Sequence, residues 1–287
     1  MQRTAAIEAT SSIPTGSLPL TGERTVPGIA SENYWFRRHQ AAYLHLREEV
    51  QGPRLLEVGA GEGYGSALLA ERAPAVLALD YDGLAVAHLV QRYPGLAAIR
   101  ANLAALPVAD ASFDTVVSLQ VIEHVWDHPQ FVAECARVLR PGGLLMLSTP
   151  NRLTFSPGAG PTDKPLNPFH THEFTAAELH RLVAGSGLSV LAVRGLFAGP
   201  RLAALDSRHS ANGGFVAAQL ATPPEQWPAG LAADVASIGW QDFQVGPDCQ
   251  IGPDFQIGPG GQDDLTALDD LTALDECLDL ILLARRA

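Results

Sequence analysis

From residue 54 onward the chain alternates short apolar segments with amphipathic ones, and this alternation constrains the fold more than any other feature. Apolar runs predict seven strands, at residues 54–59, 75–80, 96–101, 113–119, 144–148, 188–193 and 278–283. Helical periodicity predicts helices at residues 34–50, 66–72, 84–92, 129–139 and 175–184. Ser31 or Asn33 would cap the first of these helices, and a capping box of Thr175 and Glu178 would begin the last. Strands that alternate with helices are typical of a parallel sheet covered on both faces, so we expect an α/β fold.

The first predicted strand runs into a glycine-rich turn, with Gly59, Gly61 and Gly63 at alternate positions. Glycines at such a turn let backbone amides approach a ligand closely. A dinucleotide-binding turn would need its third glycine at the sixth position, which is Tyr64 here, and the chain has no phosphate-binding Gly-Lys-Ser/Thr motif. Glu57 lies within the motif, where its carboxylate can meet the ligand directly or through water. The turn therefore predicts a ligand site other than a dinucleotide or P-loop site.

Polar residues follow the second and third predicted strands. Asp80 ends the second strand, twenty-one residues after Gly59, and an acid at this distance can accept both ribose hydroxyls of a nucleoside. Asn102 and Leu103 follow the third strand, where a polar side chain or a backbone amide would meet the edge of an adenine. Taken singly, each of these residues could be an ordinary loop residue. In this order along the sheet, they predict a nucleoside site at the carboxyl ends of the strands.

These motifs, together with Phe113-Asp114 and the Leu-Arg-Pro-Gly-Gly segment at 139–143, resemble those of class I S-adenosylmethionine-dependent methyltransferases over residues 54–150. The resemblance implies a Rossmann-like sheet of seven strands in the order 3-2-1-4-5-7-6, with the last strand antiparallel. It implies S-adenosyl-L-methionine as the cofactor, with Gln120 near its methionine part and Tyr81 beside Asp80 among the binding residues. Acceptors in this family range from proteins and nucleic acids to sugars, so the fold alone does not identify the acceptor.

Glu123 and His124 follow the fourth strand, at the mouth where methyl transfer must occur. A hydroxyl acceptor must lose its proton, to a base such as His124 or with the help of a metal ion. A histidine here could instead only cap the next helix or bond a backbone carbonyl. Gln120-x-x-Glu123-His124 is similar to the Glu-x-x-Glu-His motif with which ubiquinone-pathway O-methyltransferases and small-RNA 2′-O-methyltransferases hold a divalent cation. Because Gln120 replaces a carboxylate, a Mg²⁺ site would be weakened or reshaped, and the ligands that we assign to it are Glu123 and His124.

Two further segments point to the acceptor. On a helix, Trp35, Arg38 and His39 share one face with Tyr34 beside them, a surface suited to a ligand lid, although packing on the sheet is the alternative. His170 and His172 lie in a loop after the fifth strand that can fold over the same mouth, or they are solvated histidines of a rigid connector. Together with residues 121–127 and 149–152, these segments resemble the mycobacterial methylmannose polysaccharide 1-O-methyltransferases.

That resemblance implies methyl transfer to a sugar hydroxyl, above all the 1-OH of a 3-O-methylated mannoside. It implies that five side chains contact the acceptor, namely Tyr34, Trp35, His39, His170 and His172. Two rival functions stay open. One is a small-molecule quinol or phenol O-methyltransferase, which Trp35 and Trp126 would also suit. The other is a non-catalytic nucleoside-binding partner of an active methyltransferase.

Composition and repeats complete the prediction. Twelve of the 31 acidic residues lie between His209 and Ala284, where there is no Lys or Arg, and 19 acids face 19 basic residues elsewhere. This charge argues against a nucleic-acid partner, and no apolar run is long enough for a membrane. We expect a cytoplasmic enzyme acting on a small molecule or oligosaccharide, with a homodimer left open. Its parts would be a disordered tail (1–20), a helical lid (21–53) and a methyltransferase domain (54–287), whose hexad repeats at about 240–276 look like a loop expansion without a periodic apolar face.

Overall fold

The computed structural model describes residues 18–19, 24–246, 249 and 271–287. The predicted disordered tail lies outside these residues except at its end. There Leu18 is buried in a small cluster with Val26 and Ala85, so this residue packs against the protein. Most of the hexad repeats also lie outside the described residues.

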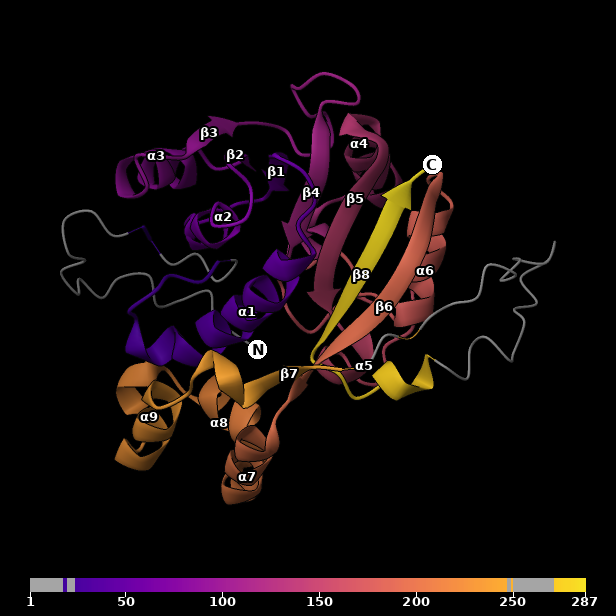
Figure 1. Cartoon of the computed structure of the whole chain (residues 1–287). Coiled ribbons are helices and arrows are strands. Elements are labelled where there is room, and N and C mark those ends of the chain that lie inside the picture. The colour runs from indigo at the N-terminus through magenta and orange to yellow at the C-terminus, as the bar shows by residue number, and fades with distance from the viewer. Residues whose placement is uncertain (1–17, 20–23, 247–248, 250–270) are drawn as a thin grey trace.

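The core is a single eight-stranded sheet (Figure 1). The strands are β1 (Arg54–Val58), β2 (Ala75–Asp80), β3 (Ala97–Arg100), β4 (Phe113–Leu119), β5 (Leu139–Pro150), β6 (Leu188–Ala198), β7 (Phe243–Val245) and β8 (Asp279–Arg286). Their order is β3-β2-β1-β4-β5-β8-β6-β7, and β8 is antiparallel to both β5 and β6. The predicted order 3-2-1-4-5-7-6 is therefore confirmed, with β8 as the seventh strand of that order. The short β7, antiparallel to β6, is an addition at the edge.

Helices cover both faces of the sheet. One face carries α4 (His128–Val138) and α6 (Ala176–Ala184), whose apolar residues belong to one core cluster. The other face carries α1 (Asn33–Leu46) and α2 (Tyr64–Leu69). Helix α3 (Gly83–Arg92) contacts β2 and β3, and α5 (Arg152–Phe155) follows β5. The capping box of Thr175 and Glu178 at the start of α6 is confirmed.

Helix α1 begins differently from the prediction. A 3-10 turn (Ala30–Glu32) leads into it, and no side chain caps its first residues. The Asn33 amide instead donates hydrogen bonds to the carbonyl oxygens of Val235 and Ile238, at 2.9 Å each. The predicted cap at Ser31 or Asn33 was therefore wrong, because tertiary contacts take up the Asn33 side chain.

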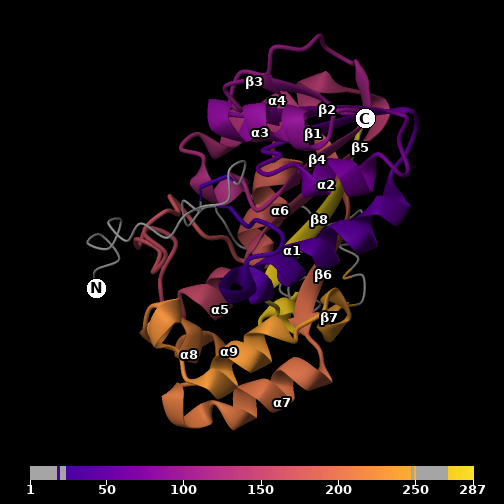
Figure 2. The same ribbon diagram turned by 90° about the vertical axis from the view of Figure 1, so that its left-hand side faces the viewer.

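Three helices that the sequence did not predict follow β6, namely α7 (Pro200–Arg208), α8 (Phe215–Ala221) and α9 (Ala229–Ala236). Figure 2 shows them grouped at one end of the molecule, beside α1. Phe215 is 2% exposed and packs edge-on against Tyr34 of α1, at 5.8 Å between ring centroids. The three helices thus extend the core on the α1 side of the sheet.

The described ends of the repeat segment are packed. Phe243 is 2% exposed and pairs with Ala198 of β6, and Cys249 bridges to Val193. Beyond the residues that are not described, Leu271 and Leu274 belong to the main core cluster. The sequence suggested a loop expansion without a periodic apolar face, but the apolar residues at its described ends complete the core around β6 and β8.

Candidate functional site

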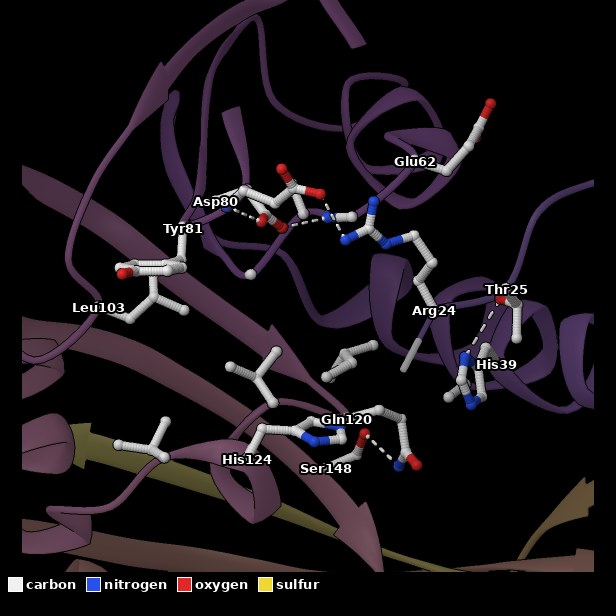
Figure 3. A pocket seen from close by; sticks show the side chains of 18 of the residues that line it. Arg24, Thr25, His39, Glu62, Asp80, Tyr81, Leu103, Gln120, His124 and Ser148 are labelled. Carbon is white, nitrogen blue, oxygen red and sulfur yellow. Dashed lines mark hydrogen bonds and ion pairs between the residues drawn. The ribbon is translucent and has the colours of Figure 1, made fainter. Parts of the chain in front are cut away.

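A cavity of about 650 Å³ opens at the carboxyl ends of the central strands (Figure 3). It lies where parallel α/β sheets generally bind their ligands. Nine of the residues that the sequence singled out line it: His39, Gly59, Gly61, Asp80, Tyr81, Asn102, Leu103, Gln120 and His124. Because these residues come from α1 and from the ends of four strands, the structure brings together most of the candidate cofactor site.

The glycine turn after β1 leaves backbone open to the cavity. Gly61 has a φ of 56°, and a Cβ built on it would meet no atom within 4 Å, so a ligand can lie directly against the main chain. Gly59 also lines the cavity, but a Cβ there would lie 2.3 Å from Cγ2 of Val121. Gly63 lies outside the cavity lining and forms the N-cap of α2.

Asp80 holds the turn and faces the cavity. Its Oδ2 accepts a hydrogen bond from the backbone N–H of Gly61 at 2.7 Å, and its Oδ1 accepts one from Asp82 at 2.8 Å (Figure 3). Each carboxylate oxygen can accept a second hydrogen bond, so both can also receive ribose hydroxyls. Tyr81 is 66% exposed at the same end of the cavity, and Arg24 forms an ion pair with Asp82 at 2.7 Å. This end has the groups that a nucleoside needs.

Glu57 is not brought to the cavity. Its fully buried carboxylate accepts a hydrogen bond from the Tyr43 hydroxyl at 2.6 Å and another from the Ser66 hydroxyl. Burial raises the pKa of Glu57 to about 7, although the two hydroxyls act against this shift. Tyr43 itself lines the cavity. The carboxylate therefore lies behind the cavity wall and fixes Tyr43 in that wall.

His124 lines the cavity at the end of a 3-10 turn (Ile122–His124), and its Nδ1 lies 3.0 Å from the carbonyl oxygen of Phe169. Its ring lies 5.0 Å from that of His170. Potential ligand atoms of Glu123, His124 and His170 all lie within 4.8 Å of one another, close enough to hold one metal ion. Burial raises the pKa of Glu123 to about 7, and the neighbouring His170 acts against this shift. The structure thus places His170 beside the two residues that the sequence suggested as metal ligands.

The loop that contains His170 is fastened to the turn at Glu123. The backbone N–H of Thr171 donates to the Glu123 carbonyl at 2.7 Å, and its hydroxyl donates to the Val125 carbonyl at 2.6 Å. His170 Nδ1 lies 2.7 Å from the Glu173 carboxylate. The loop therefore packs on this turn and holds the His170 ring in one orientation, but His170, which the sequence assigned to the acceptor, is not among the residues that line the cavity.

The other predicted acceptor residues lie elsewhere. Tyr34 is 2% exposed and packs among Phe215, Phe243 and Trp35 in the core. Trp35 packs on Phe155, and neither Tyr34 nor Trp35 is among the residues that line the cavity. His172 lies against Phe174, at 4.4 Å between ring centroids, and also away from the cavity. Of the aromatic and histidine residues of α1 that the sequence assigned to the acceptor, the structure brings only His39 to the cavity.

His39 is held as a neutral imidazole. Burial lowers its pKa to about 3, and the nearby charges of Arg38 and His124 act in the same direction. Its Nδ1 lies 3.4 Å from the Thr25 hydroxyl, which also bonds the Tyr64 hydroxyl at 3.0 Å (Figure 3). A neutral histidine can donate one hydrogen bond and accept another, so it suits a ligand that carries hydroxyl groups.

Sequence reasoning assigned no role to several polar residues of the cavity wall, among them Arg24, Thr25, Tyr43, Tyr64, Ser148 and Asp279. Asp279 is 1% exposed and forms a buried ion pair with Arg38 of α1. One signal for it was present, because an acid at the start of an otherwise apolar strand is unusual. The partners are 241 residues apart, and no local pattern connects them.

Comparison with known proteins agrees with this geometry. Residues 56–147 match a family model described as a methyltransferase domain. A probable S-adenosylmethionine-dependent methyltransferase of Mycolicibacterium smegmatis is 52% identical over 233 residues, which cover 80% of this chain and 89% of that protein. A protein of Mycobacterium tuberculosis strain H37Rv with the same description is 53% identical over 230 residues, covering 79% and 82%.

More distant proteins share the fold or part of the chain. A ubiquinone biosynthesis O-methyltransferase of Pseudomonas aeruginosa is 34% identical over 115 residues, which cover 38% of this chain and 50% of that enzyme. Among solved structures, a possible histamine N-methyltransferase from Thermotoga maritima superposes with a TM-score of 0.54 at 16% identity, covering 88% of this chain and 93% of that one. At that identity the likeness shows the fold alone. In the described part of the chain, every helix is too short or too polar to cross a membrane.

Proposed function

We propose that this chain, which belongs to the S-adenosylmethionine-dependent methyltransferases, transfers the methyl group of S-adenosylmethionine to a hydroxyl of a sugar acceptor. The acceptor that we propose is the 1-OH of a mannoside, in a small molecule or an oligosaccharide. The observation that carries the hydroxyl assignment is His124, which lines the cavity beside Gln120 with Glu123 and His170 next to it.

The residues present fit the cofactor. Gly61 offers bare backbone to the cavity, and the Asp80 carboxylate can accept further hydrogen bonds there. We assign the ribose to Asp80, the adenine to Asn102 and Leu103 with Tyr81 beside them, and the methionine part to Gln120. The cofactor supplies an activated methyl group, while the chain positions the acceptor for in-line displacement and removes its proton.

His124 has the tautomer that a base requires. Because a carbonyl oxygen only accepts hydrogen bonds, the contact with Phe169 makes Nδ1 the protonated nitrogen. The lone pair is then on Nε2, which takes the proton of the acceptor hydroxyl. The imidazole is held by the same loop that positions His170.

A divalent cation is the alternative route to the same deprotonation. Glu123, His124 and His170 would supply one carboxylate and two imidazoles, and Glu173 would orient the His170 ring. Imidazole ligands suit transition metals better than Mg²⁺, which prefers oxygen. If a cation binds here, we therefore propose Mn²⁺ or a similar ion ahead of the Mg²⁺ that the resemblance suggested. A bound cation would also offset the burial that raises the pKa of Glu123 to about 7.

A quinol or phenol acceptor is the second candidate. Trp126 lines the cavity and is 88% exposed, so its ring is available to stack on an aromatic acceptor. The partial similarity to a ubiquinone biosynthesis O-methyltransferase points the same way. We favour the sugar because polar groups line the acceptor end, among them His39 and His124.

Transfer of a radioactive methyl group from the labelled cofactor to a panel of mannosides, catechols and quinols tests this proposal. We expect turnover with mannosides, whereas methylation of catechols or quinols alone would refute the sugar assignment. His124→Ala should lower the rate by roughly 10²–10⁴-fold while the affinity for S-adenosylhomocysteine stays close to that of the wild type. His128→Ala is the matched control, because this nearby histidine lies outside the cavity lining.

Chelation separates the two routes. If His124 acts as a base alone, EDTA should have no effect. If it acts as a metal ligand, EDTA should abolish turnover, and Mn²⁺ or Mg²⁺ should restore it. Near-normal turnover of the His124→Ala enzyme would exclude both routes.

A further inference from the structure

A buried ion pair joins the cavity wall to the protein behind it, since Asp279 is among the lining residues and Arg38 is not. Arg38 of α1 is 3% exposed and Asp279, the first residue of β8, is 1% exposed. The Arg38 Nε donates to Asp279 Oδ2 at 2.8 Å, and Nη2 contacts the other carboxylate oxygen and the Leu278 carbonyl. The guanidinium also lies over the Phe155 ring, 4.3 Å from its centroid. Buried ion pairs of this kind contribute little net stability compared with apolar residues of similar size, so their presence beside a cavity calls for another reason.

The ion pair is connected to the cavity through Gln120. The Gln120 Nε2 donates to Asp279 Oδ1 at 3.1 Å and to the Ser148 hydroxyl at 3.2 Å (Figure 3 shows the second bond). An amide nitrogen has two hydrogens, and these two bonds use both. A carboxylate paired with arginine only accepts hydrogen bonds, so the amide must turn its nitrogen toward Asp279. The orientation of the Gln120 amide is thereby set, and its oxygen Oε1 is the atom left to serve a ligand.

The backbone of Gln120 is also held in a costly conformation. Its φ is 58°, and among the described residues only Ala111 is another non-glycine with positive φ. Such a conformation is unfavourable for a residue other than glycine and tends to occur at functional sites. The Gln120 N–H donates to the Ser148 carbonyl at 2.9 Å, which fixes the residue at the end of β4. The main chain and the side chain of Gln120 are therefore both held in position by hydrogen bonds.

A donor-only group is the natural partner of Oε1. The nucleoside end of the cavity lies at Asp80 and Asn102, after β2 and β3, whereas Gln120 ends β4 on the other side of β1. The methionine end of the cofactor therefore extends toward Gln120, and its ammonium group only donates hydrogen bonds. Glu57, the carboxylate within the glycine motif, does not reach this region, because it is fully buried and lies outside the cavity lining.

We propose that Arg38 and Asp279 are positioning residues that orient the Gln120 amide, so that its oxygen receives the ammonium group of S-adenosylmethionine. This arrangement also explains why residue 120 is an amide in a motif that elsewhere has a glutamate. A glutamate there would set its charge against Asp279, which already occupies the other side. The inference rests on the cofactor and not on the sugar acceptor.

Binding of two ligands distinguishes a role in orienting the Gln120 amide from a role in stabilising the fold. S-adenosylhomocysteine has the ammonium group, whereas 5′-methylthioadenosine has the same nucleoside and sulfur but no amino-acid end. In Asp279→Asn the side chain keeps its shape but can donate as well as accept, so the Gln120 amide is free to turn. Calorimetry should show about 5–20-fold weaker binding of S-adenosylhomocysteine, and binding of 5′-methylthioadenosine within about 2-fold of the wild type.

Three further variants complete the test. Gln120→Leu should give the same selective loss, and combining it with Asp279→Asn should add nothing, because both act through one oxygen atom. Arg38→Lys, which keeps the charge, should retain part of the binding. Glu49→Gln is the control, since it breaks an ion pair with Arg194 that also ties the N-terminal helical region to the sheet but does not contact Gln120. It should leave both ligands unaffected.

The outcomes are decisive in either direction. Equal losses for both ligands in Asp279→Asn and Gln120→Leu would show that the network only supports the fold, and unchanged binding of both would show that Oε1 meets no cofactor group. Either result overturns the proposal. If Asp279→Asn does not fold, Gln120→Leu and Arg38→Lys with the same two ligands decide the question. No acceptor is needed, so the result is independent of the sugar assignment.

Discussion

Replacing Asp80 with alanine tests the assignment of the ribose site. The Asp80 carboxylate holds the glycine turn through the N–H of Gly61 at 2.7 Å and accepts from Asp82 at 2.8 Å. In the complex it would also accept the ribose hydroxyls. A hydrogen bond to a charged group contributes about 1.5–3 kcal/mol net. We expect a loss of that size, because some of the hydroxyl bonding is replaced by water, and this corresponds to roughly 10–150-fold weaker binding.

Calorimetric titration with S-adenosylhomocysteine measures this loss. Asp80→Asn keeps one acceptor oxygen and should lose less than Asp80→Ala. Asp110→Ala is the control, because Asp110 is an exposed acid that pairs with Arg137 and lies outside the cavity lining. A 2′-deoxyribose analogue of the ligand should bind the wild type more weakly and should lose less affinity in Asp80→Ala than the parent ligand does, because only the 3′-hydroxyl bond is left to lose. Unchanged affinity of the alanine variant for S-adenosylhomocysteine would refute the ribose assignment.

Three further predictions concern stability. Phe243→Ala should lower the free energy of unfolding by about 3–5 kcal/mol in chemical denaturation, because this side chain is 2% exposed and packs against Tyr34, whereas the exposed Leu220→Ala should change it little. Removing one hexad, residues 255–260, should shift the melting temperature by only a few degrees, and a large shift would show that this part also packs. Folding lowers the pKa of His39 from 6.5 to about 3, so on acidification the unfolded chain binds this proton before the folded protein does. The free energy of unfolding should therefore fall as the pH drops from about 6.5 toward 3, with a slope of at most about 1.4 kcal/mol per pH unit. In His39→Gln that contribution is absent, so the stability difference between wild type and variant should shrink on acidification, and a difference that is constant with pH would contradict the assignment.

The sequence predicted the sheet because its signals are local. Each strand is an apolar run between turns, and β2 and β4 begin and end at the predicted residues. The helices α7 to α9 were missed because each has only seven to nine residues. Gly213-Gly214, Pro223-Pro224 and Pro228 break the segment into pieces too short to show helical periodicity. Their helical state depends on packing against α1, which the sequence does not reveal.

In the site, too, local patterns were predictable and long-range contacts were not. Gly59, Gly61 and Asp80 were predictable because they lie at the ends of two consecutive strands, within 22 residues of one another in the sequence. The neighbours of Glu57 were not predictable, since Tyr43 comes from a helix that precedes the sheet. The pairing of Arg38 with Asp279 spans almost the whole chain. Local spacing thus identified residues that line the cavity, whereas the groups that hold those residues in place required the structure.

The contacts of α1 bear on how ligands enter. One face of this helix meets the cavity wall at both ends, through Tyr43 with Glu57 and through Arg38 with Asp279. A lid that opens must break few buried contacts, and these two are among the most buried polar contacts at the site. Opening is less costly for the segment just before α1, where Arg24 is 13% exposed and its partner Asp82 is 32% exposed. We therefore expect α1 to stay in place as part of the wall, and movement that admits the cofactor to be confined to the segment around Arg24.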